Sequence, residues 1–97
     1  MEVKVSGASE VTVYGDIKSI EDYQEIKNAV KGLVSSGKNS LVIKIPDSLS
    51  MTSSVIGFLL KLTYGDQVKI AMLVKDERLY NLLDVLNLIT VFDVKKL

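Results

Sequence analysis

The chain has 97 residues, the size of one domain whose core needs no disulfide or bound metal to hold it together. Lys and Arg number 12, as do Asp and Glu, so the formal net charge is zero and no basic surface for nucleic acid is indicated. Cys and His are both absent, which excludes disulfides, zinc sites built on these residues, and a Ser-His-Asp relay.

The sequence offers no segment that would enter a membrane. Its longest apolar run, Val55–Leu60, is far shorter than the roughly 20 residues that span a bilayer. The first residues, Met1–Lys4, lack the apolar stretch of a secretory signal. We therefore expect a cytoplasmic protein with no membrane insertion.

The first elements should be a hairpin and a helix. Alternating apolar and polar residues predict strands at 3–5 and 10–14, and the short link between them predicts an antiparallel pair. A helix is predicted for 20–36, because Ser19 can cap its first turn and Gly37 follows its last apolar residue. Its apolar stripe should consist of Tyr23, Ile26, Val30 and Leu33.

The middle of the chain predicts a strand, a serine-rich turn and a helix. Residues 41–45 form an apolar strand that Pro46 ends, and apolar residues on both faces predict a central strand covered on two sides. The next eight residues, 47–54, contain four Ser and one Thr. They lead into a predicted helix at 53–64, where the interior Gly57 should allow the close approach of a neighbouring backbone.

The start of this helix has an unusual charge pattern. No acidic residue occurs from Ser48 to Gly65, the residue that should end the helix. Helix starts usually carry Asp or Glu, which offset the positive end of the helix dipole. Here that end is uncompensated, so an anion placed on it would be stabilised.

The last third of the chain completes an α/β fold. Residues 68–74 predict a strand, Asp76 predicts the N-cap of a helix, and 89–94 predict a fifth strand before a tail at 95–97. The buried stripe of that helix should be Leu79, Leu82, Leu83 and Leu86. The order β-β-α-β-α-β-α-β predicts one domain over 1–97, a mixed four- to five-stranded sheet with three helices and right-handed crossovers.

Two stretches resemble a known family. Ser-Met-Thr-Ser-Ser-Val-Ile-Gly-Phe-Leu-Leu at 50–60 resembles the signature turn of the STAS domain, the fold of the anti-sigma factor antagonists, which has an apolar residue, Asp-Ser-Ser/Ala-Gly-Leu-Gly and an aliphatic run. Gly15-Asp16-Ile17 is similar to that family's Gly-x-Leu/Ile-Asp motif at the end of the second strand. The predicted order of elements matches over essentially the whole chain. The resemblance implies a STAS-like regulatory binding module and not an enzyme, and we expect no cofactor or metal.

The resemblance also implies a partner and a switch. In the antagonists, the unphosphorylated form binds an anti-sigma factor that is also a serine kinase, and phosphorylation of the first Ser of the motif releases it. Matched residue by residue, that phosphoacceptor is Ser53, with Thr52 as the alternative. The residues expected to bind the partner are Asp16, Lys18, Leu49, Met51, Thr52, Ser54, Val55 and Ile56.

Three positions depart from the family pattern. Thr52 stands where the family has Asp, Lys18 stands where it has the other Asp, and Val55 replaces the first glycine of the turn. Both changed acids usually lie near the phosphoacceptor. We expect Lys18 to lie close to an anion on Ser53 if the two loops lie together as they do in the family.

Other interpretations of the same residues stay open. In one alternative, the hydroxyls of residues 50–54 cap a helix and have no further role. The chain could be a constitutive STAS subunit of another complex, such as a lipid-transport ABC system, and it could form a homodimer. A small hydrolase would use Ser53 with Lys18 or Lys61 as base, although no oxyanion or acid–base constellation is visible. Lys44 is expected at an edge or rim of the sheet, and solvated turn carboxylates are favoured over magnesium ligands for Asp16 and Asp47.

Overall fold

A computed structural model describes residues 1–97 and has the predicted α/β order β-β-α-β-α-β-α-β. The elements are β1 (Glu2–Gly7), β2 (Glu10–Tyr14), α1 (Ile20–Ser35), β3 (Ser40–Ile45), α2 (Ser53–Tyr64), β4 (Lys69–Val74), α3 (Glu77–Val85) and β5 (Val94–Lys96). The five strands form one mixed sheet in the order β1-β2-β3-β4-β5, in which β1 is antiparallel to β2 and every other pair is parallel. The predicted hairpin and the mixed sheet are therefore confirmed.

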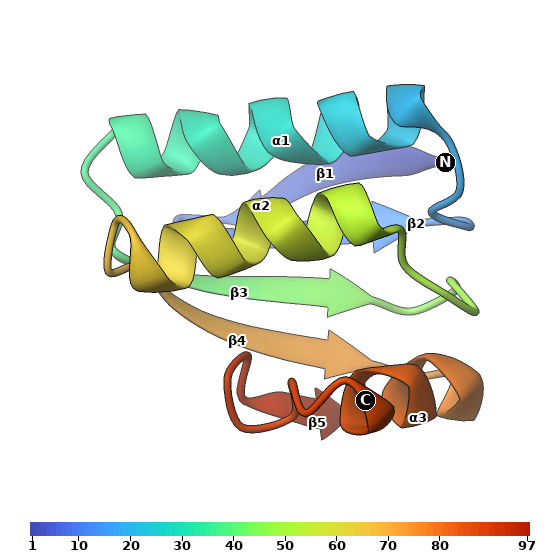
Figure 1. Cartoon of the computed structure of the whole chain (residues 1–97). Coiled ribbons are helices and arrows are strands. Elements are labelled where there is room, and N and C mark those ends of the chain that lie inside the picture. The colour runs from blue at the N-terminus through green and yellow to red at the C-terminus, as the bar shows by residue number, and fades with distance from the viewer.

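The three helices lie on one face of the sheet (Figure 1). Each crossover moves one strand along the sheet in the same direction, and a shared right-handed sense puts every helix on the same side. The prediction that β3 is covered on two sides is wrong. Leu41, Ile43 and Ile45 are buried under the helices, whereas Val42 and Lys44 are half-exposed on the other face.

The sequence predicted that Lys44 lies at an edge or rim of the sheet, and this prediction is wrong. Lys44 belongs to the middle strand of the sheet, and its ammonium lies 3.4 Å from the carboxylate of Glu10 on the uncovered face. The same carboxylate accepts a hydrogen bond from the Ser6 hydroxyl, which is the main reason that the pKa of Glu10 lies below its usual value. A network of polar side chains thus occupies part of the face that no helix covers.

Local signals position α1 as predicted. The Ser19 hydroxyl accepts a hydrogen bond from the backbone N–H of Asp22, and the Asp22 carboxylate accepts from the backbone N–H of Ser19, which is a capping box. The helix ends at Ser35, and Gly37 beyond it adopts a φ of +98° that favours glycine. Of the predicted stripe, Ile26, Val30 and Leu33 are buried, while Tyr23 is half-buried at the rim.

The helix α2 has the predicted bounds, and Gly65 caps its end. The explanation predicted for Gly57 is wrong, however. A Cβ added to Gly57 would meet nothing within 4 Å, and the residue is exposed. No backbone approaches it closely.

The end of the chain differs most from the prediction. The fifth strand was predicted at 89–94 but lies at Val94–Lys96, within the predicted tail. Residues 88–93 instead form turns that bury Leu88 and Phe92, with Asn87 and Asp93 at positive φ on either side. Apolar residues four positions apart suit a helical turn better than an alternating strand, and this spacing prevails. The stripe of α3 is also narrower than predicted, because Leu79 and Leu83 are buried but Leu82 and Leu86 are not.

Candidate functional site

The loops that follow β2, β3 and β4 meet at one edge of the sheet, which we call the carboxyl edge (residues 15–19, 46–52 and 75–76). Parallel strands end on the same side, so these loops lie beside one another, as Figure 1 shows for the ends of β3 and β4. The serine turn, residues 47–54, lies between the other two because β3 is the middle strand.

Hydrogen bonds fix the serine turn to the loop after β2. The backbone N–H of Gly15 donates to the Asp47 carboxylate at 2.9 Å, and the backbone N–H of Leu49 donates to the Asp16 carboxylate at 3.4 Å. The two loops therefore lie together, as the resemblance implied. Asp16 and Asp47 each bind a backbone N–H of the opposite loop, which gives these carboxylates a structural role.

Ser48 joins the two loops from inside. Its hydroxyl accepts a hydrogen bond from the backbone N–H of Ile17 at 3.0 Å and donates to the carbonyl of Ser50 at 2.7 Å. The side chain is completely buried. No residue pattern predicts this role, because Ser48 is one of several serines in the turn and only the fold distinguishes them.

Thr52 and Ser53 have different environments although they are neighbours. The Thr52 hydroxyl caps α2 by accepting a hydrogen bond from the backbone N–H of Val55 at 3.3 Å, and Thr52 is half-buried. Ser53 is the first residue of α2 and is exposed, as is Ser54. No acidic residue lies in the first turn of the helix. Of the two predicted acceptors, Ser53 is thus the more accessible.

Burial divides the residues expected to bind a partner. Met51 and Val55 are only 7% and 1% exposed, so they pack in the core and present no surface, which corrects their assignment to a contact patch. Met51 and Val55 lie in or beside a polar turn, and their apolar side chains pack in the hydrophobic core. Leu49, Asp16 and Lys18 are exposed, and Ile56 is half-buried.

The surface next to Ser53 is apolar on one side of α2. Phe58 packs edge-to-face on Tyr23 and so marks the side of α2 that faces α1. By helical spacing, Ile56 and Leu60 lie on the opposite side of the helix, toward α3. Both are only partly buried against the core.

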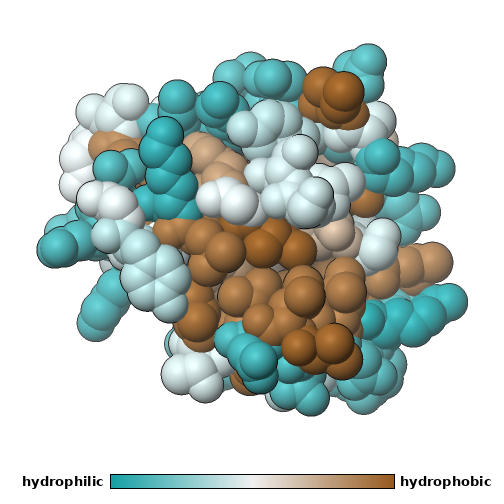
Figure 2. Space-filling view, viewed as in Figure 1, coloured by the Kyte–Doolittle hydropathy of each residue, from teal (hydrophilic) through white to brown (hydrophobic).

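The helix α3 contributes the other half of this apolar surface. Its Tyr80 faces β5, since the Lys96 ammonium lies 5.4 Å from the ring centroid. Leu82, Val85 and Leu86 lie on the other side, toward α2, and Val85 and Leu86 are 78% and 45% exposed. Figure 2 shows a continuous hydrophobic area between α2 and α3. We use the name apolar patch for the partly buried or exposed apolar residues that helical spacing places on the facing sides of these two helices, which are Ile56, Leu60, Leu82, Val85 and Leu86.

Arg78, in the first turn of α3, pairs with Asp76 of the carboxyl edge, although no sequence pattern identified it. Its guanidinium makes two hydrogen bonds with the Asp76 carboxylate, at 2.9 and 3.1 Å. These bonds lower the pKa of Asp76, and Asp76 in turn raises the pKa of Arg78, with a smaller contribution from Asp16. The start of α3 is therefore within electrostatic reach of the loop after β2. The position of Arg78, two residues beyond the predicted N-cap Asp76, was the one sequence feature that could have identified it.

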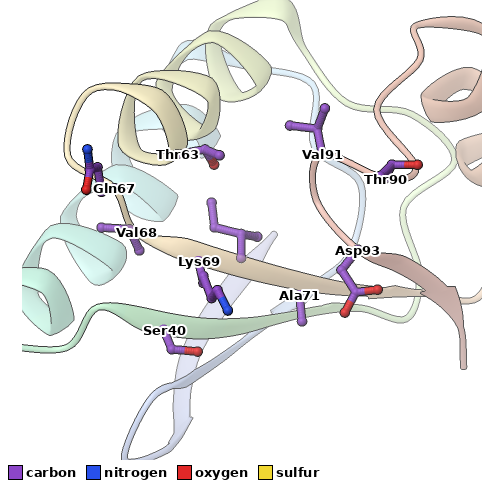
Figure 3. Close-up of a pocket in the computed structure, with 10 residues that line it drawn as sticks. Ser40, Thr63, Gln67, Val68, Lys69, Ala71, Thr90, Val91 and Asp93 are labelled. Atoms are coloured by element: carbon purple, nitrogen blue, oxygen red, sulfur yellow. The ribbon is translucent and has the colours of Figure 1, made fainter.

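The largest cavity lies elsewhere, at the amino ends of β3 and β4, and has a volume of about 630 Å³ (Figure 3). It lies where β5 has not yet begun, because β5 pairs with β4 only from Met72 onward and the first half of β4 has a neighbouring strand, β3, on one side only. Thr63, Lys69 and Asp93 are among its lining residues. Since none of the residues predicted to bind a partner lines this cavity, the candidate site is the carboxyl edge together with the apolar patch.

No group of three or more Asp or Glu side chains is placed to hold a metal ion, and no helix combines the length and apolar character needed to cross a membrane. The chain matches no protein-family model and no curated protein sequence.

Proposed function

We propose that the chain is a regulatory protein-binding module that docks on a signalling partner through the serine turn and α2. The partner class implied by the resemblance is an anti-sigma factor that is also a serine kinase. The observation that carries the proposal is the position of Ser53, an exposed hydroxyl at the start of a helix whose next turn begins the apolar patch. Exposed apolar areas of this kind mark protein interaction sites.

The serine turn is also suited to recognition because it is held in place. Three side chains, those of Asp16, Asp47 and Ser48, tie it to the loop after β2. A partner that binds an ordered turn loses less conformational entropy than one that binds a mobile loop. The exposed groups presented on this support are Leu49, Ser53 and Ser54.

We further propose that phosphorylation of Ser53 controls docking. A phosphate adds roughly −1.5 to −2 charges. At the first residue of α2, where no acid offsets the helix dipole, the fold should tolerate this charge or gain about 0.3–1 kcal/mol from it. A partner surface that covers the apolar patch would have to desolvate the same charge, which is costly. The modification would then change binding greatly and stability little.

Thr52 is a less suitable acceptor, because its hydroxyl already caps α2. This cap also favours a second candidate function, a constitutive subunit of another complex such as a lipid-transport ABC system. There Thr52 would serve only the helix, and no kinase would be needed. The two functions differ in one measurable respect, which is the effect of a phosphate on Ser53 upon partner binding.

Lys18 should contribute to the switch if the first function holds. It is exposed in the loop that is hydrogen-bonded to the serine turn. Its ammonium would then attract a phosphate on Ser53 and help to hold it in one position. Lys18→Ala should therefore reduce the effect that phosphorylation of Ser53 has on partner binding.

A further inference from the structure

A second concave surface lies on the other side of α2, away from the apolar patch. It is a groove of about 420 Å³ between α1 and α2. Its lining includes two aromatic residues, Tyr23 and Phe58, and three lysines, Lys27, Lys31 and Lys61. None of these residues lies in the serine turn or in the apolar patch, so the groove requires its own explanation.

The floor of the groove is aromatic and ordered. Tyr23 and Phe58 pack edge-to-face with ring centroids 6.4 Å apart and an interplanar angle of 83°. Phe58 is buried and Tyr23 half-buried, so the pair is anchored in the layer between the helices. The Lys27 ammonium lies 5.6 Å from the Tyr23 ring centroid, which brings a positive charge to the side of this floor.

The rim of the groove carries unpaired positive charge. The chain has five ion pairs, and none of them involves Lys27, Lys31 or Lys61. Only one carboxylate, that of Asp66, lines the same groove. Three ammonium groups and one carboxylate leave an excess of positive charge in a chain whose formal net charge is zero. An anion is therefore the complementary occupant.

Gly57 gives an independent indication that the groove is kept open. A glycine inside a helix costs about 1 kcal/mol relative to alanine. That cost has no packing reason here, because a Cβ at this position would meet nothing within 4 Å. Gly57 lines the groove, and the absence of a side chain there leaves the space next to this part of α2 open. We therefore infer that Gly57 is present because it leaves room at the groove.

We propose that this groove binds a small organic anion that carries a flat aromatic ring. The ring lies on the floor formed by Tyr23 and Phe58, and the anionic group lies among the ammonium groups of Lys27, Lys31 and Lys61. Aromatic side chains favour a flat apolar body through edge and face contacts. Lysines act as point charges toward an anionic group. The proposal does not depend on a partner at the serine turn.

The test uses two probes that differ in charge. 8-Anilinonaphthalene-1-sulfonate is an aromatic anion, and N-phenyl-1-naphthylamine has the same rings without the sulfonate. We expect the anion to bind the folded chain at least tenfold more tightly than the neutral probe, measured by fluorescence titration at low salt. Equal affinities would overturn the proposal, because the ammonium groups would then contribute nothing.

Matched variants locate the site. Lys31→Gln with Lys61→Gln should weaken binding of the anion at least tenfold, whereas the exposed, unpaired pair Lys38→Gln with Lys75→Gln should change it less than twofold. Gly57→Leu should abolish binding while leaving the thermal unfolding transition cooperative, since leucine is a better helix former than glycine. When the anionic probe is added, two-dimensional NMR should show chemical-shift changes at Tyr23, Gly57 and Lys61. Chemical-shift changes confined to the apolar patch would overturn the assignment, and so would an equal loss of probe affinity in the two double lysine variants.

Discussion

The buried hydroxyl of Ser48 accepts a hydrogen bond from the backbone N–H of Ile17 at 3.0 Å, although the two residues are 31 positions apart. Through the carbonyl of Ser50, the same hydroxyl also holds the next part of the serine turn. The loop after β2 and the serine turn are therefore one hydrogen-bonded unit and not two independent loops. The geometry of this unit depends on a side chain that never reaches the surface.

Ser48→Ala should destabilise the fold by about 1–3 kcal/mol, because the buried N–H of Ile17 loses its acceptor. Chemical denaturation measures this change. Ser54→Ala is the matched control, since Ser54 is exposed and its loss should change stability by less than about 0.5 kcal/mol. Equal effects of the two substitutions would show that Ser48 does not hold the loops together.

Thr52→Ala and Ser53→Ala should separate capping from signalling. Loss of the Thr52 cap should cost about 1 kcal/mol of stability. Ser53→Ala should leave stability within about 0.5 kcal/mol of the wild type, because Ser53 is an exposed first residue of the helix. Thermal and urea unfolding of the two variants provide the measurement. A larger loss for Ser53→Ala would mean that Ser53 serves the fold.

The capping box of α1 should make stability depend on acid pH. Hydrogen bonds from the backbone N–H groups of Lys18 and Ser19 hold the pKa of the Asp22 carboxyl below its usual value. A carboxyl whose pKa is lower in the folded state than in the unfolded state stabilises the fold at pH values above its unfolded-state pKa. This stabilisation is lost as the pH falls through the folded-state pKa. The difference in unfolding free energy between wild type and Asp22→Asn should therefore shrink between pH 6 and pH 2. A constant difference would contradict this role of the ionised carboxylate.

The apolar patch should matter for binding more than for stability. Val85→Gln removes an apolar side chain that is 78% exposed, so its effect on stability should stay within about 0.5 kcal/mol. Binding of the partner should fall about tenfold if the patch is covered in the complex, as measured by surface plasmon resonance with the purified partner. Ile20→Gln is the control, because Ile20 is 75% exposed at the start of α1, outside the patch. Equal losses for both variants would place the interface elsewhere.

Local patterns predicted most of the fold. Ser19 and Asp76 were identified as caps from the residues that follow them, and both cap helices in the structure. The bounds of α2 follow from a hydroxyl-rich start and the glycine at its end. Each of these features is decided within a few residues of sequence, so a pattern of residue types is enough to locate it.

The errors arise where distant contacts decide. Met51 and Leu86 are both apolar residues near the ends of helices, yet Met51 is buried and Leu86 is 45% exposed. Which of them is covered depends on how α2 and α3 lie on the sheet. The short β5 has the same cause, since burial of Leu88 and Phe92 in a turn took precedence over the strand predicted from 89–94. The role of Ser48 likewise depends on a loop 31 residues away.

The most direct test of the central claim is the affinity of the purified partner for the unphosphorylated chain and for the chain with phosphoserine at position 53. The partner is first captured with the unphosphorylated form and then identified by mass spectrometry. The proposed function predicts that phosphoserine at 53 weakens binding at least tenfold, and that Lys18→Ala reduces this difference. The wild type and the phosphorylated chain should unfold at similar temperatures. Equal affinity of the partner for both forms would contradict the switch and favour a constitutive subunit in which Ser53 belongs only to the helix.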